Sequence, residues 1–200
     1  MFGREITKDS EKVSLLNTDK EETLLSETND KPNEYNLFYD YIVNGNHKYI
    51  GFGYQYLYES VYSKLYDLKL NVIYNVDKRS SYNINSNEYY NGNISFSENG
   101  NFYEYYDGKF NEYDPNGKKL KSINIDGEVK MVIDKYAVVI NNTSLVLKTM
   151  DKTITIDKWD DDRVFHNDLS YYDKGVHLVV GYNESLINYY YNPSTGKVTF

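Results

Sequence analysis

The sequence predicts an all-β protein built from antiparallel, blade-like repeats, and its composition, its residue periodicity and a repeated turn support this prediction. Ala137 is the only alanine, whereas tyrosine supplies 24 of the 200 residues. Because alanine is the best helix former and tyrosine favours strands, this composition disfavours helices. Short polar turns separate the apolar and aromatic segments. The predicted fold class is β-propeller-like, as a partial or open array or as a closed ring.

Individual strands are recognisable from their residue patterns. Tyrosine occupies every second position from residue 54 to residue 62 except position 60, which predicts a strand with one aromatic face. Residues 136–140 and 176–180 are apolar runs typical of strands covered on both faces. Gly51-Phe52-Gly53 predicts a strand irregularity. Tight hairpins are predicted at the polar dipeptides Asn99-Gly100, Asp107-Gly108, Asp134-Lys135 and Asn183-Glu184.

One turn is repeated along the chain. Residues 110–120 and 189–198 both run from a tyrosine-bearing strand through Asx-Pro-polar-Gly-Lys into an apolar residue. Proline fixes φ early in such a turn and glycine accepts the left-handed conformation near its end, so both copies predict a hairpin. Weaker copies lie at 15–25, 65–73 and 147–154. The lysines after the five turns are 34 to 49 residues apart, which is typical of four-stranded blades: Lys20, Lys69, Lys118, Lys152 and Lys197.

Through the two Asx-Pro-polar-Gly-Lys copies, the chain resembles bacterial β-propellers of the quinoprotein-like and related repeat families. The resemblance implies four-stranded units in which the repeated turn joins the third strand to the fourth. We expect a single domain over 1–200, with units at 30–77, 78–126, 127–157 and 158–200. Residues 1–29 are expected to form an orphan hairpin or a partly helical arm. Because the last unit already ends in an outer strand, the usual strand exchange does not close a ring, and we expect a truncated or partnered molecule.

Charge and composition exclude several classes of function. The formal charge of −8 argues against nucleic-acid binding, which requires a basic surface. The absence of cysteine excludes disulfides, thiolate metal sites and a cysteine nucleophile. No signal peptide and no apolar run long enough to span a membrane occurs in residues 1–200, so membrane insertion is not expected. The compartment stays open, and a secreted or cell-surface location is expected only if the chain continues upstream.

Candidate sites are few. Asp157, Asp160, Asp161, Asp162 and Asp168 form an acidic stretch that could supply oxygen ligands to Ca²⁺, although a solvated acidic loop is the favoured interpretation. The three histidines lack a two-ligand spacing, and His177, inside an apolar strand, is interpreted as a hydrogen-bonded structural residue. No phosphate loop, dinucleotide fingerprint or serine elbow is present, so we predict no cofactor and no catalytic residue.

The predicted function is therefore a non-enzymatic interaction or recognition domain with a protein or glycan partner. A glycan or cell-wall binding module is the main alternative, because residues 101–109 are similar to the aromatic hairpins of clostridial and streptococcal wall-binding repeats. A carbohydrate-active enzyme is the second alternative, because a propeller can bring distant carboxylates together.

Overall fold

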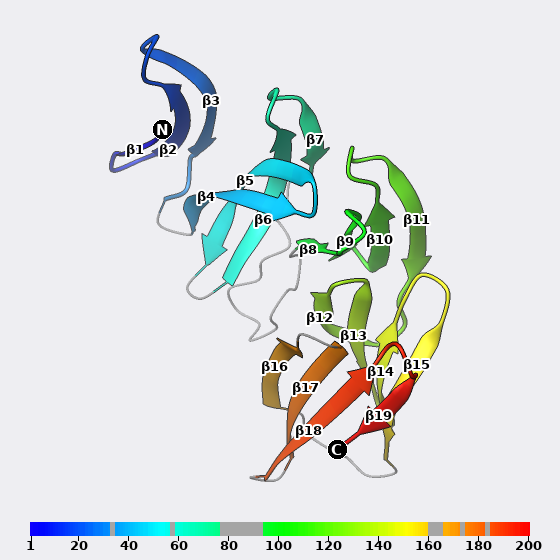
Figure 1. The fold of residues 1–200 in the computed structure, drawn as a ribbon. Coiled ribbons are helices and arrows are strands. Elements are labelled where there is room, and N and C mark those ends of the chain that lie inside the picture. The colour runs from blue at the N-terminus through cyan, green and yellow to red at the C-terminus, as the bar shows by residue number, and fades with distance from the viewer. Residues whose placement is uncertain (33–34, 57–58, 77–93, 160–165, 173–174, 183–184) are drawn as a thin grey trace.

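The computed structural model describes residues 1–32, 35–56, 59–76, 94–159, 166–172, 175–182 and 185–200. This part of the chain contains nineteen strands in five antiparallel sheets and no helix (Figure 1). No segment there could therefore cross a membrane as a helix. The prediction of an all-β fold with blade-like sheets is confirmed, and the array is open.

Each sheet is a meander in which strands adjacent in sequence pair with one another. The first sheet contains β1 (Phe2–Ile6), β2 (Glu11–Asn17) and β3 (Glu22–Asn29). The second contains β4 (Asn36–Asn44), β5 (His47–Tyr56), β6 (Glu59–Asp67) and β7 (Val72–Asn75). The third contains β8 (Ile94–Phe96), β9 (Phe102–Tyr106), β10 (Lys109–Tyr113) and β11 (Lys119–Asn124). The fourth contains β12 (Glu128–Ile133), β13 (Tyr136–Asn141), β14 (Ser144–Lys148) and β15 (Thr153–Lys158). The fifth contains β16 (His166–Tyr172), β17 (Gly175–Tyr182), β18 (Ser185–Asn192) and β19 (Lys197–Thr199).

The four-stranded sheets lie within the units expected from the turn spacing, except that β15 extends one residue beyond residue 157. The first 29 residues form a three-stranded sheet that contains the expected hairpin as β2 and β3, with β1 paired to it, and no helical arm. Alternation explains this sheet: Val13 and Leu15 lie on one face of β2 and pack against the second sheet.

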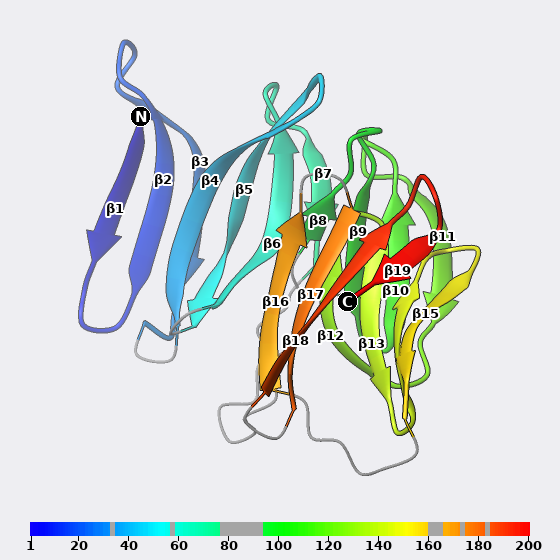
Figure 2. The ribbon, with the colours of Figure 1, turned by 60° about the horizontal axis from the view of Figure 1, so that its bottom comes forward.

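Successive sheets pack face to face in an open arc, and the chain ends lie far apart (Figures 1 and 2). A separate apolar cluster fills each of the four interfaces between neighbouring sheets. A central residue from each side of these interfaces illustrates the arrangement: Val13 and Phe52, Leu65 and Phe102, Phe110 and Val139, Leu147 and Leu178. The described array is therefore a series of small cores and not one continuous core.

The repeated turn begins, in all five sheets, with a side chain that accepts hydrogen bonds from the turn backbone. Asp114 Oδ1 accepts the N–H groups of Asn116 and Lys118, both at 2.9 Å. Equivalent bonds are made by Asn17, Asp67, Thr149 and Asn192. The lysines are not equivalent, since Lys69 lies two residues after Asp67 and therefore matches Asn116, not Lys118. An Asx or Thr oxygen that compensates backbone donors is the physical element of the repeat.

The structure corrects one predicted strand, at 54–62, and confirms an irregularity at 51–53 and a strand at 136–140. The tyrosine-rich segment 54–62 is not one strand, because β5 ends at Tyr56 and β6 begins at Glu59. Alternation continues on both arms of a hairpin, so the pattern did not reveal the reversal. The irregularity at Gly51-Phe52-Gly53 is present as a register shift between Phe52 and Gly53. The predicted inner strand 136–140 lies in β13, where Tyr136 to Val139 are buried.

Many tyrosines join neighbouring sheets through carboxylates. Tyr66 of the second sheet donates to Glu27 of the first at 3.0 Å. Glu104 of the third sheet accepts hydrogen bonds from Tyr74 of the second sheet and from Tyr113. In the C-terminal half, the Tyr189 hydroxyl lies 2.6 Å from Asp157 Oδ2. These side chains combine a large apolar ring with a polar end, which suits an interface between small sheets.

Candidate functional site

A cavity of about 290 Å³ lies where the third, fourth and fifth sheets meet, and we call it the three-sheet cavity. It is formed by β9 and β10, by the hairpins after β12 and β14, and by the end of β18. Its lining residues are Tyr103, Glu112, Lys135, Tyr136, Thr149, Met150, Asp151, Lys152, Tyr191 and Pro193. Segments almost 90 residues apart in sequence therefore meet at this position.

One wall of the three-sheet cavity carries an oriented carboxylate. Glu112 Oε1 accepts hydrogen bonds from the Tyr103 hydroxyl and the Asn101 side-chain amide, both at 2.8 Å. In the described part of the chain Glu112 Oε2 has no such partner. Burial, followed by the hydrogen bond to Glu112 and its charge, raises the pKa of Tyr103. The Tyr103 hydroxyl therefore stays protonated and holds the carboxylate in place.

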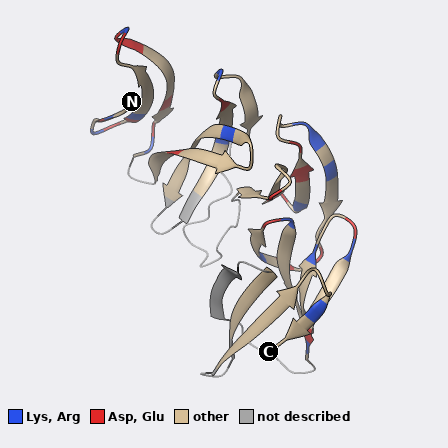
Figure 3. Cartoon of the chain, viewed as in Figure 1, with Lys and Arg blue, Asp and Glu red and all other residues tan. Residues whose placement is uncertain are grey.

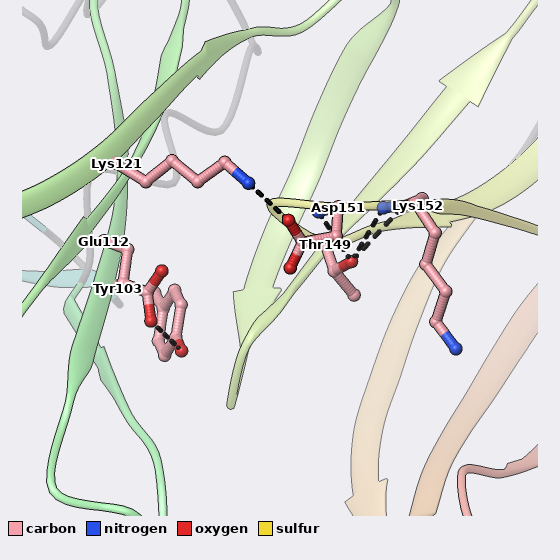
Figure 4. Close-up of polar contacts among 6 residues, drawn as sticks. All are labelled: Tyr103, Glu112, Lys121, Thr149, Asp151 and Lys152. Atoms are coloured by element: carbon pink, nitrogen blue, oxygen red, sulfur yellow. Dashed lines mark hydrogen bonds and ion pairs between the residues drawn. The ribbon is translucent and has the colours of Figure 1, made fainter.

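The other side of the cavity is formed by the turn after β14. Thr149 Oγ1 accepts the backbone N–H groups of Asp151 and Lys152, at 3.2 and 3.1 Å. Asp151 forms an exposed ion pair with Lys121 of β11, whereas the Lys152 ammonium points away from this pair (Figure 4). Within the described residues, neither Lys152 nor Lys135 forms an ion pair. Both lysines line the cavity and are exposed, and the Lys135 ammonium also lies over the Tyr136 ring, 5.8 Å from its centroid.

The floor of the three-sheet cavity is apolar and tightly packed. Tyr103, Tyr136 and Tyr191 are 3 to 4% exposed, and Met150 is 8% exposed. The rings of Tyr136 and Tyr191 meet edge to face, with centroids 5.9 Å apart. Because their faces are covered, these rings provide no open stacking platform. Recognition in this cavity therefore depends on its charged and hydrogen-bonding rim.

The lining of the three-sheet cavity is balanced in charge, with Lys135 and Lys152 against Glu112 and Asp151, although the whole chain is acidic. The outer strand β11 adds Lys119 and Lys121 in its first half, and Lys121 reaches the cavity rim through its pair with Asp151 (Figure 3). Between residues 118 and 158 the sequence contains eight lysines and five acidic residues. This region therefore favours anionic groups more than the net charge of −8 suggests.

A second, wider cavity is lined by Asp126–Glu128 and Ile140–Thr143. Several of its oxygen-bearing groups have partners within the protein. Trp159 donates through its backbone N–H to the Thr143 carbonyl and through its ring N–H to the Asn142 carbonyl, at 3.0 and 2.9 Å. Glu128 is paired with Lys130. We assign this cavity no role.

The acidic stretch proposed as a Ca²⁺ site is only partly described. Asp157 accepts the hydrogen bond from Tyr189 noted above. Asp160, Asp161 and Asp162 lie outside the described residues, and for Asp168 the structure describes only its place in β16. Among the side chains that the structure does describe, no three potential metal-binding residues come together.

His177 behaves as a partnered residue of β17. Its Nε2 lies 3.0 Å from Asn188 Oδ1, and its ring stacks on Tyr190 with centroids 4.3 Å apart. The hairpin compared with wall-binding repeats is internal only in part, since Phe102 and Tyr103 are buried in two different cores and residues 107–109 are exposed. No protein-family model and no curated protein matches the sequence.

Sequence reasoning did not identify Glu112, Lys135 or Tyr191 as site residues. Lys152 was recognised only as a turn marker. The available signal was the repeated turn itself, because turns at equivalent positions of stacked sheets lie at the same edge of the array. Of the two lysines that line the cavity, only Lys152 follows such a turn, because Lys135 lies in the hairpin after β12.

Proposed function

We propose that the chain is a non-enzymatic recognition domain for a protein partner and that the three-sheet cavity binds an anionic group of that partner. The single observation that carries this proposal is that two exposed lysines, Lys135 and Lys152, line a polar cavity and form no ion pair with any described residue. A lysine ammonium attracts carboxylates and donates up to three hydrogen bonds.

The size of the cavity supports a macromolecular partner. At about 290 Å³ it lies just below the range of about 300 to 1,000 Å³ typical of small-molecule pockets. Such a space accommodates one side chain or a chain terminus, while the rest of the partner contacts the surrounding turns. The Glu112 carboxylate, fixed by Tyr103 and Asn101, can accept a hydrogen bond from a backbone N–H beside the anionic group.

A titration with a blocked tetra-aspartate peptide, followed by NMR, tests this proposal. We expect saturable shift changes at Lys135, Lys152 and Glu112. The double variant Lys135→Gln/Lys152→Gln should weaken binding by about tenfold, because two charge-assisted contacts are lost. Lys69→Gln, an exposed lysine in a turn of the second sheet, is the matched control and should bind as the native chain does. Shift changes that are unsaturable or confined to β11 would argue against the cavity.

Glycan binding is the second candidate, and a specific surface favours it. Tyr190 is 40% exposed on the outer face of the fifth sheet, beside His177 and Asn188. Aromatic faces stack on sugars and amides bond to hydroxyl groups, although cross-strand packing alone also accounts for the pair. Binding on a glycan array that is lost in Tyr190→Ala and retained in Lys135→Gln/Lys152→Gln would favour this candidate over the first. Hydrolysis of a glycoside panel, abolished by a single carboxylate change, would favour an enzyme over both.

A further inference from the structure

Within residues 1–200 the first sheet contains three described strands, whereas each of the other sheets contains four. In the four-stranded sheets, the fourth strands β7, β11, β15 and β19 contain mostly exposed or half-buried residues, whereas the third strands β10 and β14 each contain several buried ones. In the first sheet β3 has the mostly exposed pattern and β2 has three buried residues. By this criterion β2 and β3 are third and fourth strands, and β1 occupies the second position. In the described part of the chain, β1 pairs with β2 alone.

Burial confirms that β1 differs from the other second strands. In β9, Phe102 to Glu104 are buried, and in β13 the four residues from Tyr136 to Val139 are buried. By contrast, no residue of β1 is buried, and Ile6 is 65% exposed. A strand with an internal position in the repeat thus has an edge environment in this sheet.

The hydrogen-bonding pattern shows which groups of β1 are free. Met1 and Leu16 exchange two backbone hydrogen bonds, at 2.9 and 2.7 Å, and the Thr7 N–H donates to Ser10 at 2.8 Å. In an antiparallel ladder, residue pairs that exchange backbone hydrogen bonds alternate with pairs that do not. Because Met1–Leu16 is a hydrogen-bonded pair, Gly3 and Glu5 also form backbone hydrogen bonds to β2. The N–H and C=O groups of the remaining β1 residues therefore point away from β2: Phe2, Arg4 and Ile6.

An uncovered apolar stripe is contiguous with this free edge. On the face of the second sheet directed at the first sheet, Tyr39, Tyr41 and Val43 of β4 are 40, 49 and 60% exposed. The Phe2 ring stacks on Tyr39 with centroids 4.0 Å apart and planes inclined by 18°. Unpaired backbone groups and exposed apolar side chains thus occur together at one end of the array.

We infer that the free edge of β1 binds an extended segment of a partner protein, which pairs antiparallel to β1 and becomes the first strand of this sheet. Strand addition supplies backbone hydrogen bonds, and alternate side chains supply specificity. The inner strands of the second and third sheets carry large apolar residues at alternate positions, such as Leu37 and Tyr39 or Ile94 and Phe96. The partner segment accordingly has large apolar side chains at every second position.

A second copy of the chain is a poorer occupant of the same edge. Each copy carries a formal charge of −8. In addition, antiparallel pairing of two β1 strands centred on Arg4 or on Glu5 would place like charges opposite each other, which is destabilising.

The test uses the full chain and a capped synthetic peptide with the sequence of an authentic inner strand, residues 36–44, extended by two lysines for solubility. We expect saturable binding by calorimetry and new amide protection at Phe2, Arg4 and Ile6. Ile6→Pro should weaken binding by about tenfold, because it removes an outward donor without removing a bond to β2. Ile6→Thr, which keeps the N–H group, is the matched control and should bind within about threefold of the native chain.

Circular dichroism verifies that both variants retain the sheet fold. Absence of saturable binding, or equal binding by Ile6→Pro and Ile6→Thr, would overturn the inference. Concentration-dependent dimerisation that Ile6→Pro abolishes, without peptide binding, would also overturn it by making a second copy the occupant. The Lys135→Gln/Lys152→Gln variant should bind the peptide normally, which separates this edge from the three-sheet cavity.

Discussion

The first and last interfaces of the array are stabilised by different interactions. The fourth and fifth sheets share a cluster of twelve buried apolar or aromatic side chains, including Trp159. In the first sheet only four residues are buried, and three of them are polar: Glu11, Ser14 and Asn29. Glu11 accepts the Leu37 N–H of the second sheet at 2.8 Å and pairs with Arg4. The first interface also has an apolar cluster, but it contains seven buried residues, of which only Val13 comes from the first sheet. The C-terminal end therefore has more apolar burial, and the N-terminal end adds hydrogen bonds and charge to a smaller apolar cluster.

This difference indicates which end of the array is expected to open locally and to bind a partner. Units with little buried apolar surface have low local stability. The three-stranded first sheet has such a composition and also has the free edge of β1. The most adaptable part of the molecule and the proposed strand-binding edge are therefore the same region.

The largest difference is expected when a leucine is replaced by alanine in each of the two interfaces separately. Leu178→Ala removes a fully buried side chain between the fourth and fifth sheets and should lower the free energy of unfolding by about 4 kcal/mol. Leu25→Ala removes a partly buried side chain between the first and second sheets and should cost about 1 kcal/mol. Urea unfolding measures both values, and equal losses would remove the distinction between the two ends.

A pair of glycines extends the comparison to the interface between the second and third sheets. Gly117 and Gly196 have φ of +83° and +69° in equivalent turns. A Cβ at Gly117 would overlap the Ile73 carbonyl oxygen, whereas a Cβ at Gly196 would meet nothing within 4 Å. Gly196→Ala should cost about 1 kcal/mol from backbone strain alone, and Gly117→Ala about 3 kcal/mol. Thermal unfolding distinguishes them, and an equal effect would show that the close approach is unimportant.

The charge at the N-terminal interface is tested by Glu11→Gln. Glu11 is 1% exposed, so the loss of its negative charge leaves Arg4 and the Leu37 N–H with a weaker acceptor. We expect a loss of about 2 kcal/mol in the free energy of unfolding, against almost none for the exposed Glu22→Gln. If the two variants are equally stable, the interface does not depend on this carboxylate.

Alkaline pH should lower the free energy of unfolding gradually, with a smaller effect than the substitutions above, because two tyrosines of the N-terminal half lose protons. Burial, then the charge of Glu27 and the hydrogen bond to it, raises the pKa of Tyr66 to about 12. Burial, with the charge of Asp114, raises the pKa of Tyr49 to about 12. Folding favours the neutral phenols, so their contribution is complete below about pH 10 and is lost as pH rises towards 12. Tyr66→Phe should reduce the fall in stability over this range, and an unchanged slope in urea unfolding would contradict this assignment.

Local sequence patterns predicted the fold class because strands and turns are local. The apolar run that includes Ala137 and Val138 reflects burial on both faces of β13, and Asp107-Gly108 forms the hairpin between β9 and β10 with positive φ at both residues. The reversal after Tyr56 was not predicted, because tyrosine alternation is the same on both arms. The tyrosine content indicated strands only, whereas bonds such as Tyr66–Glu27 show that tyrosine side chains also join sheets.

The three-sheet cavity could not be predicted from local patterns. Glu112, Lys135 and Tyr191 come from three sheets, and their meeting depends on how those sheets stack. The free edge of β1 is similarly a property of pairing.

Amide hydrogen exchange by NMR tests the central claim most directly, because the claim concerns individual N–H groups of β1. In an edge strand, alternate amides are bonded, whereas in an internal strand all of them are bonded. We predict slow exchange at Gly3 and Glu5 and fast exchange at Phe2, Arg4 and Ile6, while consecutive amides of β13 all exchange slowly. Uniform exchange across β1, whether slow or fast, would contradict the account of β1 as a second strand with one free edge.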